Sequence, residues 1–94
     1  MRRYPRILPV GEAAFTVEFG DEVSERINRQ VHALAASLAA RPFPGLLERI
    51  PTFRSLLVTY DPMVADEKAV QAALRQALRS LVVAELPAGR LVEI

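Results

Sequence analysis

Arg54 and Ser55 are the neighbouring residues whose side chains are best suited to binding chemistry in this sequence. A guanidinium can hold a carboxylate or a phosphate through two parallel hydrogen bonds, and an adjacent hydroxyl can add a further one. The structural alternative is that the stem of Arg54 packs along a sheet and its charge pairs with Glu48 or Glu18. Arg54 and Ser55 are therefore the predicted ligand-binding residues, and no residue is predicted to be catalytic.

A metal site is not expected, because the sequence lacks the usual ligands in a suitable spacing. His32 is the only histidine, the chain has no cysteine, and no acidic residue follows His32 at the next turn of a helix. Asp21-Glu22 and Asp66-Glu67 stand where helices are predicted to begin, and the helix dipole stabilises negative charge there. His32 is therefore predicted to be a boundary or surface residue, and the carboxylates are predicted to serve helix starts instead of acid–base catalysis.

Composition excludes several kinds of partner. The 94 residues carry 12 basic and 11 acidic side chains, a formal charge of +1, so no strong positive field is expected to attract nucleic acid. The glycines are isolated and form no nucleotide-binding loop, so ATP is expected to bind elsewhere in a complex. No cofactor is predicted to bind this domain. No apolar run approaches the ~20 residues of a membrane span, and the lack of cysteine fits a reducing cytosol. A cytoplasmic protein without membrane association is expected.

The elements that must position Arg54 and Ser55 begin with a hairpin. With 51% hydrophobic and 24% charged residues, a chain of this length is expected to fold as one domain. Residues 6–10 form a short β-prone run, and residues 13–19 alternate apolar and polar side chains with the period of a strand. Gly11 can supply the positive φ that a turn between them needs, and Pro9 makes the first strand a candidate edge strand.

Two helices are predicted next. The first follows the N-cap residue Ser24, places apolar residues at helical spacing and ends before Pro42. The second follows the N-cap residue Asp66 and continues its apolar face to Leu81.

Three further strands are predicted, at residues 46–50, 54–60 and 90–94. Residues 51–53 would link the first two of these as antiparallel neighbours. The predicted fold class is α+β: a ferredoxin-like βαββαβ antiparallel sheet with two helices on one face, preceded by a short extra strand. The alternation places Phe15, Phe19 and Tyr60 in the core instead of on an RNA-binding sheet surface.

Five segments carry a resemblance to a known family. They are LPVGE at 8–12, VEFG at 17–20, Ile27-Asn28, Pro44-Gly45 and PTFRSLLVTYDP at 51–62. Together they resemble the N-terminal domain of the family that comprises the 5-oxoprolinase B subunit (PxpB), the sporulation kinase inhibitor KipI and allophanate hydrolase subunit 1. The resemblance covers nearly the whole chain, and the last segment is the most specific. The departures are modest: Glu12 stands where the family often has Asp, and Phe53 where it often has Tyr.

The resemblance implies a role inside a complex. Residues 1–94 would form a single N-terminal domain, and the cyclophilin-like C-terminal domain of the family would be absent from this chain. Family members bind, or are fused to, a KipA-like C subunit, and with the 5-oxoprolinase A subunit these cleave 5-oxoproline to glutamate using ATP. The domain is then expected to act by associating with other subunits, without activity alone. Arg54 and Ser55 remain the only polar candidates in the matching motif.

A second function, of a different class, stays open. The inhibitor branch of the family docks on a sensor histidine kinase and blocks its autophosphorylation, and this chain could belong to either branch. In both cases an exposed edge strand, at residues 6–10 or 90–94, is expected to pair with the partner. The partner that the domain binds distinguishes the two functions.

Overall fold

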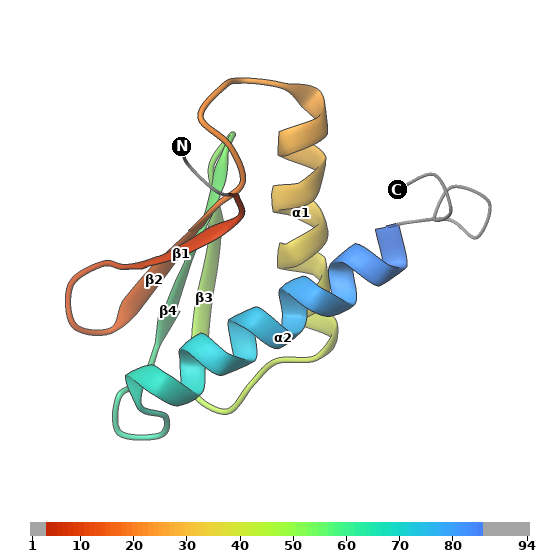
Figure 1. Cartoon of the computed structure of the whole chain (residues 1–94). Helices are drawn as coiled ribbons and strands as arrows, with labels where there is room; N and C mark the ends of the chain where they lie inside the picture. Colours follow the sequence, from red (N-terminus) through yellow and green to blue (C-terminus); the bar gives the residue numbers. More distant parts are fainter. Residues whose placement is uncertain (1–3, 86–94) are drawn as a thin grey trace.

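The computed structural model describes residues 4–85 of the chain, as one four-stranded sheet and two helices (Figure 1). The elements are β1 (Arg6–Pro9), β2 (Ala14–Glu18), α1 (Glu25–Ala40), β3 (Leu46–Pro51), β4 (Ser55–Tyr60) and α2 (Glu67–Glu85). The sheet is antiparallel, with the order β1-β2-β4-β3, and both helices lie on the same side of it (Figure 1). The α+β, ferredoxin-like prediction is confirmed. The strand predicted at 90–94 and the loop before it lie outside the described residues.

The β1–β2 hairpin forms as its residue types predict. Gly11 adopts a φ of 64°, in the left-handed region that side chains with a Cβ disfavour. The backbone N–H of Val10 donates to the carbonyl of Ala14 at 2.9 Å, which closes the turn. Pro9 lies in β1, which is an edge strand paired only with β2 among the described strands. Central strand β2 therefore has β1 on one side and β4 on the other.

Both helices begin at the predicted caps. Ser24 has extended backbone, and its hydroxyl accepts a hydrogen bond from the N–H of Ile27 at 3.1 Å. The carboxylate of Asp66 accepts one from the N–H of Ala69 at 2.7 Å. In each case the side chain satisfies a backbone donor that the first turn leaves without a carbonyl partner.

The core lies between one face of the sheet and the two helices. Because side chains alternate along a strand, β2 and β4 each send every second residue toward the helices. The buried hydrophobic residues of the sheet side and of α1 and α2 are Phe15, Val17, Phe19, Leu56, Val58, Tyr60, Ile27, Val31, Leu34, Leu38, Val70 and Leu74. Phe15, Phe19 and Tyr60 are therefore core residues, as predicted. No helix in the described part of the chain has the length and apolar character needed to cross a membrane.

Candidate functional site

Three polar side chains, Arg6, Glu18 and Ser55, form a row across one end of the sheet. Glu18 is the register partner of Arg6 on β1 and of Ser55 on β4. Glu18 and Ser55 each adjoin a buried core residue, so their side chains lie on the face of the sheet opposite α1 and α2. Strand alternation and register thus place a cation, a carboxylate and a hydroxyl side by side.

The charge of Glu18 is balanced within this row. The Nε of Arg6 donates to Oε1 of Glu18 at 2.8 Å, and both side chains are about one-third exposed, at 36% and 32%. The guanidinium of Arg6 also lies 5.6 Å from the centroid of the Tyr4 ring, within the range of a cation–π contact. Arg6 is therefore held by two neighbours, and it holds the Glu18 carboxylate in place.

Thr52 organises the turn that brings Arg54 and Ser55 to this row. Its hydroxyl oxygen accepts hydrogen bonds from the backbone N–H of Ser55 at 3.0 Å and of Arg54 at 3.3 Å. The Thr52 hydroxyl donates to the Ser55 carbonyl at 3.1 Å, and its oxygen lies 2.8 Å from the hydroxyl oxygen of Ser55. The backbone N–H of Thr52 donates to that carbonyl at 2.8 Å. One threonine thus fixes the hairpin between β3 and β4.

Arg54 is held by its backbone and presents its side chain to solvent. Its carbonyl accepts a hydrogen bond from the N–H of Phe19 at 3.0 Å, which extends the pairing of β2 with β4 by one step. The predicted structural alternative, an ion pair with Glu18 or Glu48, is not formed. Glu18 pairs with Arg6, which makes the one ion pair found among the described residues.

These side chains line a small polar pocket of about 200 Å³. It is formed by Tyr4, Arg6, Glu18, Gly20, Asp21, Thr52, Arg54 and Ser55. Arg54 and Ser55, the predicted binding residues, therefore lie in one pocket. Sequence reasoning missed the contribution of Arg6, Glu18 and Thr52, because that contribution depends on which residues face each other across neighbouring strands.

The remaining chemical candidates lie outside this row. His32 is exposed on α1, as predicted for a surface residue. Asp66 caps α2 and Glu67 lies in its first turn. Asp21 and Glu22, in contrast, precede the cap of α1, whose first turn carries Glu25 instead. The described residues contain no cluster of three or more side chains able to hold a metal ion.

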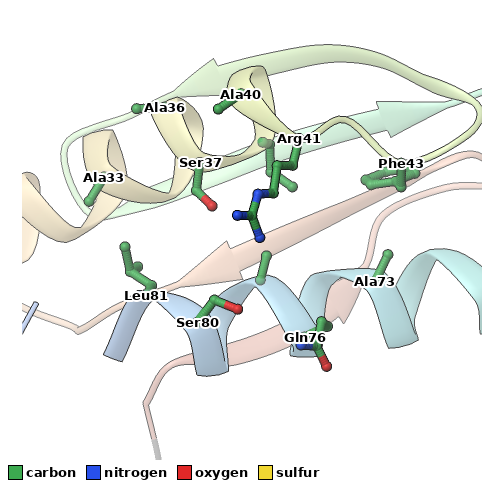
Figure 2. A pocket seen from close by; sticks show the side chains of 12 residues that line it. Ala33, Ala36, Ser37, Ala40, Arg41, Phe43, Ala73, Gln76, Ser80 and Leu81 are labelled. Carbon is green, nitrogen blue, oxygen red and sulfur yellow. The ribbon is translucent and has the colours of Figure 1, made fainter. Parts of the chain in front are cut away.

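A second, larger hollow lies between the two helices, with a volume of about 680 Å³ (Figure 2). Its walls are mostly small or apolar side chains, among them Ala33 and Ala36 of α1 and Ala73 of α2. Figure 2 shows the guanidinium of Arg41, the C-cap residue of α1, lying between the helices. Because alanines keep the facing walls short, the helices leave space here that larger side chains would fill.

The sequence of this chain is similar to one protein family and to one of the curated proteins. Residues 5–94 match the family model described as carboxyltransferase domain, subdomain C and D. Over 56 residues the chain is 46% identical to the 5-oxoprolinase B subunit of Bacillus subtilis strain 168. That match covers 60% of this chain and 23% of the relative, so the chain spans about a quarter of the length of this curated protein.

Two solved structures share both the fold and the sequence pattern. A conserved uncharacterized protein of Pyrococcus horikoshii has a TM-score of 0.81 and 39% identity, covering 84% of this chain and 37% of that one. The N-terminal domain of the histidine kinase inhibitor KipI from Bacillus subtilis has a TM-score of 0.69 and 32% identity, covering 81% of this chain and 85% of that domain. The resemblance to KipI and to the 5-oxoprolinase B subunit is thus confirmed, and the chain belongs to the carboxyltransferase domain, subdomain C and D, family.

Proposed function

We propose that this chain is the N-terminal domain of one component of an ATP-dependent 5-oxoprolinase complex, and that it acts by associating with other subunits instead of by its own catalysis. The observation that carries the proposal is the 46% identity to the 5-oxoprolinase B subunit over 56 residues. In this proposal the partners are the 5-oxoprolinase A subunit together with a KipA-like C subunit. ATP is consumed by the complex, and the complex works in the cytoplasm.

The chemistry of the polar pocket supports a binding role. Ser55 and Thr52 bring aliphatic hydroxyls to the pocket, and such a hydroxyl needs an adjacent base to become a nucleophile. His32, the only histidine of the chain, is exposed on α1 and does not line the pocket. The groups that do line it, guanidinium, hydroxyl and carboxylate, are suited to holding a polar molecule in place.

The face of the sheet opposite α1 and α2 supports an association role. Leu8, Thr16, Leu57 and Ile50 are successive register partners on β1, β2, β4 and β3. This open-face row crosses the whole described sheet on the side away from the helices, and the Ile50 side chain is 44% exposed. A solvated sheet face usually carries polar residues, so a row with three large apolar side chains favours contact with a partner surface.

A second candidate function is regulation of a sensor histidine kinase by blocking its autophosphorylation. The likeness to the KipI N-terminal domain favours it, because this chain covers 85% of that domain at 32% identity. The open-face row could contact either a 5-oxoprolinase subunit or a histidine kinase. The two functions therefore differ in what the row contacts and not in the fold that presents it.

The test is a coupled assay of ATP hydrolysis and glutamate release from 5-oxoproline. The native protein that contains this chain is purified with its candidate A and C subunits, and each component is omitted in turn. Turnover that requires all three components supports the proposal. No turnover from the complete mixture, together with inhibition of kinase autophosphorylation by the same protein, would overturn it in favour of the regulatory function. Steady turnover by this chain alone would contradict both functions.

A further inference from the structure

We propose that the pocket built around Arg54 and Ser55 binds a small monocarboxylate that also carries an N–H group. Choosing 5-oxoproline as the representative of this class rests on the proposed function, whereas the class itself follows from the pocket. Three side chains would make the contacts: Arg54, Ser55 and Glu18, all of which line it.

The hydroxyl oxygen of Ser55 can accept a hydrogen bond from a ligand. A hydroxyl oxygen has one proton to donate and two lone pairs to accept with. The Thr52 oxygen already accepts from the backbone N–H groups of Ser55 and Arg54, at 3.0 and 3.3 Å. The Thr52 hydroxyl donates its one proton to the Ser55 carbonyl at 3.1 Å, and its oxygen lies 2.8 Å from the Ser55 hydroxyl oxygen. The Ser55 hydroxyl oxygen has no other hydrogen-bond partner within the described residues, so it can accept from an N–H donor in the pocket.

Arg54 supplies the charge that selects a carboxylate. Its side chain is exposed, and no acidic residue in the described part of the chain forms an ion pair with it. A guanidinium binds a carboxylate through two parallel charge-assisted hydrogen bonds, which are stronger than neutral ones. Arg54 thus offers donors to both oxygens of one carboxylate.

Glu18 supplies an acceptor for an N–H group. Its Oε1 receives the Nε of Arg6 at 2.8 Å, and its Oε2 has no hydrogen-bond partner within the described residues. The ion pair with Arg6 and the contact of Arg6 with Tyr4 keep this carboxylate in place. An N–H donor on the ligand would complete the coordination of Oε2.

The charge and the volume of the pocket limit further which ligands it can bind. Two cations, Arg6 and Arg54, and two anions, Glu18 and Asp21, line the pocket, so it has no excess positive charge. A phosphate would bring more negative charge beside these carboxylates and no N–H donor, which favours a singly charged acid. The volume of about 200 Å³ is below the ~300–1,000 Å³ of pockets for drug-sized ligands. A single small ring with one carboxylate and one N–H, such as 5-oxoproline, matches these limits.

The test is an amide NMR titration of the 94-residue chain with 5-oxoproline. We expect saturable shifts at the backbone amides of Gly20, Asp21, Arg54 and Ser55. The Arg54→Gln variant should bind at least about tenfold more weakly, because it loses a charge-assisted contact. The matched variant Arg29→Gln, which removes an exposed arginine of α1 outside the pocket, should bind like wild type.

Two analogues of 5-oxoproline test the contacts of its carboxylate and of its N–H group separately. Cyclopentanecarboxylate lacks the N–H and 2-pyrrolidinone lacks the carboxylate, so each should bind more weakly than 5-oxoproline. Unchanged core amide positions in the Arg54→Gln spectrum show that this variant is folded. Absence of saturable shifts, equal binding by Arg54→Gln and Arg29→Gln, or binding of both analogues as tight as that of 5-oxoproline would overturn the proposal. The assay of the complex is a separate measurement. Turnover by the complex without binding to this pocket would reject only the proposed ligand site. Binding to the pocket without turnover by the complex would reject only the proposed function.

Discussion

The hydroxyl oxygens of Thr52 and Ser55 lie 2.8 Å apart across the turn that joins β3 to β4. This contact links a structural role to a binding role. The Thr52 oxygen accepts backbone hydrogen bonds that hold the turn, and the same oxygen contacts the hydroxyl of Ser55, which lines the pocket. A change at Thr52 should therefore affect both stability and binding.

Thr52→Val is expected to lower the free energy of unfolding by about 1–2 kcal/mol, because it keeps the shape of the side chain and removes the oxygen that these hydrogen bonds use. Thr52→Ser keeps the hydroxyl and is the matched control. Urea unfolding measures both variants. Equal stability of the two would show that the hydroxyl does not hold the turn.

Gly20 permits a close approach that a larger residue would block. A Cβ at this position would lie 2.3 Å from Cδ1 of Ile27, which is buried at 3% exposure. Gly20→Ala should lower the free energy of unfolding by about 1–3 kcal/mol through overpacking. Adding Ile27→Val removes the clashing Cδ1 and should cancel part of this loss, so thermal unfolding of the double mutant should show positive coupling. Strictly additive losses would contradict the clash.

The cap of α2 gives a prediction with a control in the same chain. Asp66→Ala removes the 2.7 Å hydrogen bond to the N–H of Ala69 and should lower the free energy of unfolding by about 1 kcal/mol. Asp21→Ala removes an exposed carboxylate that precedes the cap of α1, and its effect should stay within about 0.5 kcal/mol. Chemical denaturation compares the two variants. A larger loss from Asp21→Ala than from Asp66→Ala would contradict the assignment of caps.

Leu74 anchors α2 in the core, where its side chain is fully buried. Leu74→Ala should lower the free energy of unfolding by about 2–5 kcal/mol, since it removes apolar contacts and leaves a cavity. Leu47→Ala changes a side chain that is 62% exposed and should cost less than about 0.5 kcal/mol. Circular dichroism during urea unfolding measures both. Similar losses at the two positions would mean that α2 does not pack on the sheet as described.

Local sequence signals predicted most of the fold. Ser24 and Asp66 have short polar side chains that cap helices, and Gly11 supplies the positive φ of the β1–β2 turn. These features act over a few residues, so the sequence is sufficient to locate them. The alternation of residues 54–60 likewise predicted which side of β4 is buried, as Leu56 and Val58 show.

The composition of the pocket could only be predicted in part. Arg54 and Ser55 stood out because of their chemical types, but Arg6 and Glu18 join them through strand register over long sequence separations. Register depends on how the turns close and how the core packs, which a single sequence does not specify. The shift in the register of β3 with β4 between Leu46 and Glu48 was missed for the same reason.

The central claim, that this domain acts by association through the open-face row, is tested most directly by one charge substitution on that face. Ile50→Glu places a carboxylate on an exposed residue of the row, and Val23→Glu places one on a residue that is 72% exposed in the link before α1. Both variants are made in the native protein that contains this chain, and both are expected to fold.

The measurement is co-elution of the subunits together with ATP hydrolysis that depends on 5-oxoproline. Ile50→Glu should weaken association by about tenfold or more, because it would bury an unpaired charge, and turnover should fall with it. Val23→Glu should behave like wild type in both readouts. Full association and turnover of the Ile50→Glu complex would contradict the account.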